Sequence, residues 1–141
     1  MKGYLVDTNV PSGLTREKPD AHVTAFLKSV PKEGVFLSVM TIGEICKGIN
    51  ALPTSHRRTT LQQWLDIDVR SWFAGRILPV TEAIAEQWGR MAAEAKQRGS
   101  PLAVVDGVIA ATALHRGLTL VTRNVKDFGG LDIDLFNPWE T

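Results

Sequence analysis

The sequence predicts an α/β fold in which helices cover both faces of a parallel sheet. Short apolar runs alternate along the chain with longer segments that carry apolar residues at helical spacing, and this alternation is typical of parallel sheets joined by helices. The apolar runs are continuous, as in strands that are buried on both faces. With 141 residues, 44% of them hydrophobic, the chain can bury one packed core. We therefore expect a single domain over residues 1–141.

The first part of the chain predicts two strands and two helices. Continuous apolar runs predict strands over residues 4–6 and 35–38. The segment 7–13, which contains Pro and Gly, ends the first strand. Apolar side chains at helical spacing predict helices over residues 22–30 and 41–52, and a proline directly after each of them stops the helix.

The middle of the chain predicts a long helical segment, an edge strand and a further helix. Residues 55–73 carry a helical stripe of large apolar side chains in an otherwise polar segment. Residues 77–80 predict a brief edge strand, because Pro79 would be unfavourable in a central one. Thr81 is the predicted N-cap of the next helix, whose stripe covers residues 84–95 before a Gly-Ser-Pro sequence ends it.

The last part predicts a helix, two strands and a short connection. Residues 103–115 form an Ala- and Val-rich helix that Gly117 closes. A strand follows over residues 118–121, then a loop or short helix over 124–130, and a final strand over 133–136. No repeat, low-complexity segment or linker divides the chain.

Composition excludes several classes of protein. The net charge of +1 provides no global attraction to nucleic acid or membranes, so any basic surface must be local. Cys46 is the only cysteine, which excludes an internal disulfide and fits a reducing compartment; its apolar neighbours indicate core packing. Asp7 comes too early for a signal peptide, and no apolar run approaches the roughly 18 residues that span a bilayer. We expect a soluble, cytoplasmic protein.

Acidic side chains follow the ends of predicted strands, where parallel sheets bind their ligands. Asp7 comes directly after a buried strand, and Asn124 and Asp127 follow a later one. Because acids are mostly solvated surface residues, an acid at a buried strand end requires a reason, and several converging acids indicate a divalent metal. A turn or helix-capping role before Pro11 is the structural alternative for Asp7.

Asp106 is a candidate because of its position on the helix over residues 103–115. Ile109, Ala110 and Ala113 share its face of the helix and are apolar. We therefore expect the carboxylate to point toward the interior or a cleft, where a buried acid needs a partner.

Other candidates have structural explanations as well. Thr41 and Glu44 match the capping box, in which the acid bonds back to the backbone of the cap residue, and Glu44 is also spaced for a salt bridge with Lys47. Asn124 is a possible helix cap, with Asp127 in the turn that follows.

The order of these motifs resembles the PIN-domain ribonucleases, and most of all the VapC type and the FitB-like toxins of bacterial toxin–antitoxin pairs. The matching motifs are LVDTN at 5–9, MTIGEI at 40–45, VVDGVIAATAL at 104–114 and TRN-x-x-DF at 122–128. Arg57-Arg58 in the middle helical segment is also similar to that family. The resemblance covers essentially the whole chain and implies a three-layer α/β/α sandwich with a short, mainly parallel sheet.

The resemblance places Asp7, Glu44 and Asp106 on the three core acids of the family, which hold Mg²⁺ or Mn²⁺ and hydrolyse RNA. The fourth position falls on Asn124 or Asp127. We favour Asp127 as the catalytic and metal-binding acid because an amide brings no charge. Thr8 is a polar neighbour that can orient the acids or the substrate.

The chemistry suits such a cluster. Carboxylates in one cleft raise each other's pKa unless a cation offsets their repulsion, and Mg²⁺ and Mn²⁺ prefer oxygen ligands. A divalent ion makes a bound water more acidic for attack on phosphorus, and the resemblance implies 5′-phosphate and 3′-hydroxyl products. Zinc ligands normally cluster, whereas His22, His56 and His115 are scattered.

An acidic cleft needs basic residues to attract RNA phosphates. Lys47 and Arg123 are the first candidates because they lie beside motif acids, and Thr8 and Asn124 complete the predicted substrate contacts. Further basic candidates are Arg57, Arg58, Arg116 and Lys126.

The resemblance implies partners as well. These are an antitoxin that places a C-terminal segment along the cleft, a second copy in a homodimer, and DNA only indirectly, through the antitoxin. The large apolar side chains of segment 55–73 are either core residues or part of such an interface. They are Leu61, Trp64, Leu65, Trp72 and Phe73.

Two other functions compete with a metal-dependent ribonuclease. One is a non-catalytic PIN relative that binds RNA or an antitoxin. The other is a receiver- or phosphatase-like Mg²⁺ domain, but the phosphatase motif Asp-x-Asp is absent, since Asn9 stands where its second acid would be.

Overall fold

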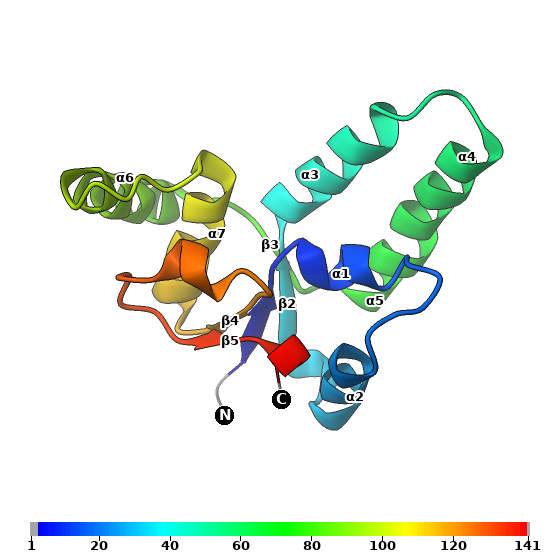
Figure 1. Cartoon of the computed structure of the whole chain (residues 1–141), viewed down its shortest axis with the longest axis horizontal. Helices are drawn as coiled ribbons and strands as arrows, with labels where there is room; N and C mark the ends of the chain where they lie inside the picture. The colour runs from blue at the N-terminus through cyan, green and yellow to red at the C-terminus, as the bar shows by residue number, and fades with distance from the viewer. Residues whose placement is uncertain (1–2, 141) are drawn as a thin grey trace.

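The protein, described over residues 3–140 by a computed structural model, is built around a five-stranded sheet in the order β3-β2-β1-β4-β5 (Figure 1). All four strand pairs are parallel. The strands are β1 (Tyr4–Val6), β2 (Val35–Ser38), β3 (Ile77–Leu78), β4 (Thr119–Val121) and β5 (Leu135–Phe136). The predicted edge position of β3 is confirmed.

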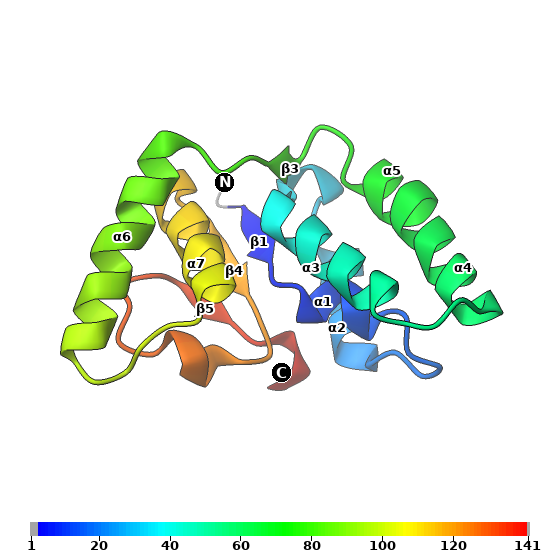
Figure 2. The same ribbon diagram turned by 90° about the horizontal axis from the view of Figure 1, so that it is seen from above.

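Helices cover both faces of this sheet, as Figure 2 shows from above. In chain order they are α1 (Asn9–Gly13), α2 (Ala21–Ser29), α3 (Val39–Asn50), α4 (His56–Gln63), a π-helical segment (Trp64–Val69), α5 (Arg70–Trp72), α6 (Glu82–Gln97) and α7 (Val104–Arg116). Short 3-10 turns occur at Lys32–Gly34, Val125–Phe128 and Pro138–Glu140. The predicted α/β/α class is confirmed.

The central strands are buried on both faces because their side chains alternate between two cores. Val6 and Val121 pack with α1, α2, α3 and the π-helical segment. Leu5 and Leu120 point the other way and pack with α6 and α7. This period-two alternation explains why the strands are continuous apolar runs.

The long middle segment is helical, as predicted, but it is interrupted. A π-helical segment separates α4 from α5. Leu65 and Phe73 are buried in the core, whereas Leu61, Trp64 and Trp72 pack against it only partly buried. The core interpretation is therefore confirmed for Leu65 and Phe73, and the interface interpretation of the other residues stays a prediction.

One helix was not predicted, and one predicted local motif is wrong. The additional helix is α1, within segment 7–13, and Pro11 stands in its first turn, where the N–H that proline lacks would have no helical partner anyway. Helix α3 begins at Val39, after Ser38, whose hydroxyl accepts the Met40 N–H at 3.0 Å. The capping box proposed for Thr41 and Glu44 is therefore not formed.

Other predicted details agree with the structure. Thr81 caps α6 by accepting the Ile84 N–H at 3.3 Å, and Gly117 closes α7 in a left-handed conformation with φ 65°. Cys46 packs half-buried against the core, and His22, His56 and His115 are all exposed. Within the described residues, no helix combines the length and apolarity that crossing a membrane requires.

Candidate functional site

The site is assembled at the carboxyl edge of the sheet, around Asp7. This residue follows β1, and its N–H donates to the Val121 carbonyl of β4 at 2.8 Å. Its side chain is only 5% exposed. The carboxylate accepts hydrogen bonds from the Thr8 N–H and the Thr122 hydroxyl, both at 2.8 Å, and from the Asn9 amide at 3.4 Å.

These contacts hold Asp7 in place without neutralising it. Burial is the main reason that its pKa is raised, and the charges of Glu44 and Asp127 raise the pKa further, against the lowering effect of the Thr122 and Thr8 hydrogen bonds. No lysine or arginine among residues 3–140 forms a salt bridge with it. A buried carboxylate without a cation is the condition that a metal ion relieves.

Glu44 enters the site from α3, one turn after the helix begins. The Thr8 hydroxyl donates to its carboxylate and also lies 3.2 Å from the hydroxyl of the buried Thr41. The alternative salt bridge with Lys47 is not formed in the described structure. Thr8 therefore connects the strand-end acid to the helix acid, which sequence spacing alone does not show.

Asp106 lies half-buried on the first turn of α7. Its predicted inward face is confirmed, because Ile109, Ala110 and Ala113 are fully buried. Burial, and after it the charges of Asp7, Glu44 and Asp127, raise the pKa of Asp106 to about 6. In the described structure no hydrogen bond or salt bridge offsets this repulsion.

The loop after β4 supplies the fourth corner. The Thr122 hydroxyl, which donates to Asp7, also accepts the Asn124 N–H at 3.1 Å. The Asp127 N–H then donates to the Asn124 carbonyl at 3.0 Å and opens the turn Val125–Phe128. The Asn124 side chain makes no capping bond, and the charge of Asp127 acts on both Asp7 and Asp106.

The four acids thus interact electrostatically, but they do not form a closed metal cage. Within residues 3–140, no group of at least three His, Cys, Asp or Glu side chains lies close enough together to hold a metal ion without rearrangement. The donor set consists of carboxylate oxygens, which suits Mg²⁺ or Mn²⁺ better than zinc. Mg²⁺ also keeps several of its waters, so it does not require direct contact with every acid.

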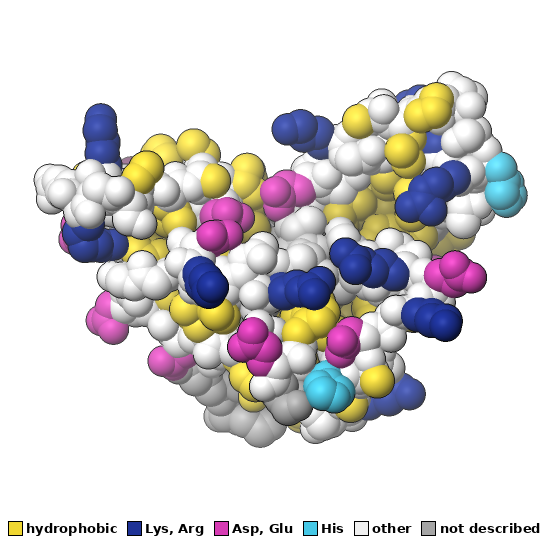
Figure 3. All heavy atoms as spheres, viewed as in Figure 1, with side chains coloured by type: hydrophobic (Ala, Val, Ile, Leu, Met, Phe, Trp, Pro, Cys, Tyr) yellow, Lys and Arg dark blue, Asp and Glu magenta, His cyan; other side chains and the backbone are white. Residues whose placement is uncertain are grey.

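Some of the basic candidates are available to bind phosphate, whereas one of them makes hydrogen bonds within the protein. Lys47 and Lys126 are exposed, and Arg123 lines a pocket beside the site. Arg58 instead donates to the Asn50 side chain at 2.9 Å and to the Leu52 carbonyl at 3.4 Å, so it joins α3 to α4. In Figure 3, acidic side chains lie at the notch between the two upper parts of the molecule, and several basic side chains lie below it.

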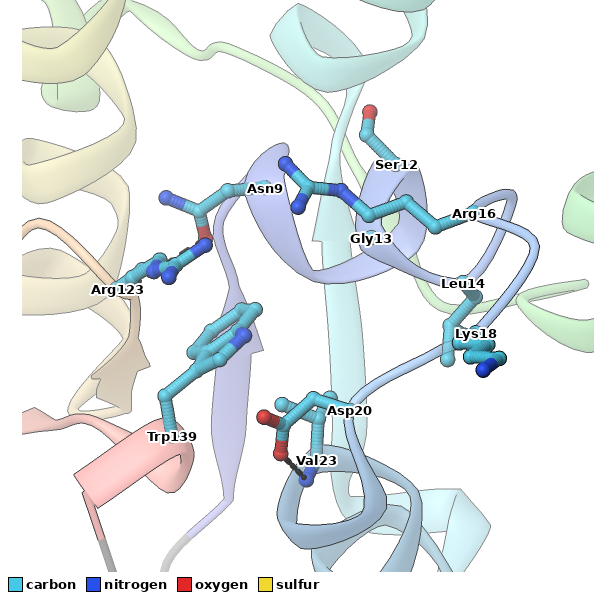
Figure 4. A pocket seen from close by; sticks show the side chains of 10 residues that line it. All are labelled: Asn9, Ser12, Gly13, Leu14, Arg16, Lys18, Asp20, Val23, Arg123 and Trp139. Atoms are coloured by element: carbon cyan, nitrogen blue, oxygen red, sulfur yellow. Dashed lines mark hydrogen bonds between the residues drawn. The ribbon is translucent and has the colours of Figure 1, made fainter.

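The pocket includes residues that the sequence did not indicate. It is lined by Asn9, Ser12, Gly13, Leu14, Arg16, Lys18, Asp20, Val23, Arg123 and Trp139 (Figure 4). Arg16 and Lys18 lie in a polar loop with no motif, and Trp139 lies beyond the last predicted strand. Only the fold brings them next to Asn9.

A parallel sheet whose first strand ends in a buried acid, joined there by acids from two helices and a later strand loop, defines a class of α/β protein with an acidic site at the carboxyl edge of its sheet. Comparison with protein families makes this specific, because the PIN domain model matches residues 4–131. The chain belongs to the PIN-domain family.

Within that family, the chain is similar to proteins of toxin–antitoxin systems. It is 38% identical to "Toxin FitB" of Neisseria gonorrhoeae, covering 96% of this chain and 97% of the relative. It is 36% identical to "VapC ribonuclease Y4jK" of Sinorhizobium fredii, with the same coverage. The crystal structure of FitAcB from Neisseria gonorrhoeae superposes with a TM-score of 0.91 over 98% of this chain and 99% of that one, at 38% identity.

Proposed function

We propose that this chain is a metal-dependent endoribonuclease and the toxin of a toxin–antitoxin pair, formed by one PIN domain over residues 1–141. The observation that carries the proposal is the convergence of four carboxylates at the carboxyl edge of the sheet, where burial first and neighbouring acids next raise the pKa of Asp7 and Asp106. The relatives named as a VapC ribonuclease and as Toxin FitB support it over nearly their whole length.

The metal ligands in this proposal are Asp7, Glu44, Asp106 and Asp127, directly or through water. When bound, Mg²⁺ or Mn²⁺ would offset the carboxylate repulsion, acidify water and stabilise charge on the phosphate. The overall reaction is hydrolysis: a water oxygen bonds to phosphorus, the bond to the 3′ oxygen breaks, and that oxygen leaves as a hydroxyl.

The chain's own residues supply orientation. Thr122 and the Thr8 N–H direct the Asp7 carboxylate, and the Thr8 hydroxyl directs Glu44. Thr8 and Thr122 each stand just after a strand of the sheet, so Asp7 and Glu44 are held in fixed orientations.

Substrate binding is assigned to residues next to the four acids in the chain or in the fold. Lys47 and Arg123 would attract phosphates, and Thr8 and Asn124 would contact the strand by hydrogen bonds. This division follows from charge, because the acidic corner by itself repels RNA and nearby cations must compensate.

The proposed protein partners are an antitoxin and a second copy of the chain. An apolar groove of about 320 Å³ between α1, α2 and the middle helices supports a protein partner; its lining includes Val10, Leu14, Trp64 and Trp72. A related structure is described as FitAB bound to an IR36 DNA fragment, which supports DNA contact through the antitoxin. A cytoplasmic location follows from the same role.

The decisive experiment is RNA cleavage by wild type and Asp7→Asn with Mg²⁺, with Mn²⁺ and with chelator. We expect cleavage only with metal, and a loss on the order of 100- to 1,000-fold in the variant because a metal ligand is removed. Wild-type cleavage rates in Asp7→Asn would refute the assignment. A protein that binds RNA but never cleaves it would instead be the non-catalytic relative.

A further inference from the structure

A second binding site adjoins the acidic corner between α1 and the C-terminal turn. It is the pocket of about 250 Å³ that includes Asn9, Arg16, Lys18, Arg123 and Trp139 in its lining (Figure 4). We propose that this pocket binds an RNA phosphate next to the scissile one, with Arg16 and Arg123 as its ligands. The proposal rests on the ribonuclease function above, because it assigns the pocket to the same strand.

The charge of the pocket favours an anion. Arg16, Lys18 and Arg123 are exposed cations that form no salt bridge within residues 3–140. Asp20 is the one acid in the lining, and its carboxylate accepts the N–H groups of His22 at 2.8 Å and of Val23, so it caps α2. Its charge interacts with a helix terminus, and the cations are left for a ligand.

Arg123 is held in position for this role. Its guanidinium carbon lies 5.6 Å from the centre of the Trp139 ring. The Asn137 side chain joins the two residues. Its amide nitrogen donates to the backbone carbonyl of Arg123 at 3.3 Å, and its amide oxygen accepts the backbone N–H of Trp139 at 2.9 Å. A guanidinium fixed in this way presents its planar fork to a phosphate at a lower entropic cost.

Asn9 places the pocket directly beside the acids. Its amide nitrogen donates to Asp7 at 3.4 Å and to Thr122 at 3.3 Å, and its oxygen accepts the backbone N–H of Arg123 at 3.4 Å. Figure 4 shows the Arg16 side chain extending toward Asn9. A strand that places one phosphate at Asp7 can therefore place a neighbouring phosphate in the pocket.

This position also favours RNA over an acidic segment of a protein. An RNA strand that passes Asp7 places its phosphates near the four acids, which repel them. Cations in the adjacent pocket offset that repulsion. A protein segment bound only in the pocket would not experience it. Arginine suits the task because it binds phosphate oxygens in a bidentate manner.

The test is equilibrium binding of a labelled single-stranded RNA of about 12 nucleotides, within the usual range of site sizes. Fluorescence anisotropy is measured in chelator at several salt concentrations, with the RNA checked for integrity. The variants are Arg16→Gln and Arg123→Gln. Arg90→Gln is the matched control, because Arg90 is exposed on α6 and paired with Glu86 at 3.5 Å, outside the pocket.

We expect each pocket variant to bind on the order of tenfold more weakly at low salt, as for a lost charged hydrogen bond. The slope of log affinity against log salt should become shallower by about 0.7 for each lost phosphate contact, and Arg90→Gln should match wild type. Trp139→Leu should weaken binding, and Trp139→Phe should restore it because a ring remains beside Arg123.

Unchanged affinity and slope in both arginine variants would overturn the proposal. It would also be overturned if those variants weakened only the complex with a protein partner, since the pocket would then belong to that interface. Because binding is measured without metal or turnover, its failure is distinguishable from loss of the cleavage that tests the proposed function.

Discussion

Asp7 and Asp106 belong to the same cluster of four acids, but the structure holds their carboxylates in different ways. Asp7, after β1, is held by three hydrogen bonds from Thr8, Asn9 and Thr122. Asp106, on the first turn of α7, receives none from the described structure, and its pKa is raised to about 6. The Asp7 carboxylate is therefore held in a fixed orientation. The Asp106 carboxylate has no partner that offsets its burial and the repulsion by the neighbouring acids. Burial opposes the charge of both acids, but at Asp7 hydrogen bonds offset part of that cost, whereas at Asp106 none do.

The largest expected effect comes from Asp106→Asn. Removing this carboxylate should lower metal-dependent RNA cleavage by about 100- to 1,000-fold, since a ligand and its charge are lost. Without metal, the variant should be more stable than wild type at pH 7, because it removes the cost of burying this charge and then its repulsion by the neighbouring acids. Cleavage assays and urea denaturation measure the two effects. A variant that is both inactive and less stable would contradict the comparison.

The pH dependence of the stability difference between wild type and Asp106→Asn tests whether the difference comes from the charge of Asp106. The folded pKa of Asp106 lies above the ordinary value of 3.8, so between those two values the folded state binds more protons than the unfolded state. The contribution of Asp106 to wild-type stability therefore falls as pH rises from about 4 to 6. Relative to Asp106→Asn, the loss should be roughly 1–2 kcal/mol after discounting for solvent screening. Saturating Mg²⁺ should reverse the order, because it stabilises wild type by binding.

A smaller effect, at Asp7, is expected from Thr122→Val. This change removes the buried hydroxyl that donates to Asp7 and leaves the carboxylate less oriented. Activity should fall by about 10- to 100-fold, as for other groups that orient metal ligands, and stability should fall by about 1–3 kcal/mol.

Thr112→Val is the matched control for Thr122→Val. Thr112 is equally buried, and its hydroxyl donates to the Val108 carbonyl within α7 at 2.8 Å, away from the acids. It should lower stability without lowering cleavage per folded molecule. Equal losses of activity in both variants would show that Thr122 acts only through stability.

The same contrast explains which parts of the site the sequence predicted. Asp7 and Asp106 were predicted because each stands in a local pattern, a strand end and an apolar helix face. Ser38 was missed as the cap of α3 because Thr41 and Glu44 formed a better local motif, and the choice between them depends on where β2 ends. The Thr8–Glu44 and Asn9–Arg123 contacts join residues far apart in the chain, so only the folded sheet shows them.

The smallest expected effect concerns how α7 is seated. Gly107, next to Asp106, lies so close to α6 that an added Cβ would be 2.8 Å from the Trp88 ring, whereas Gly89 on α6 has open space. Gly89→Ala should therefore raise stability by about 0.5–1 kcal/mol, the usual gain in a helix. Gly107→Ala should instead lower it by about 1 kcal/mol or more, because the ring must move. Thermal unfolding of both variants measures the difference. A gain in both would mean that α7 can shift freely against α6, and then the first turn that carries Asp106 would not be fixed by this contact.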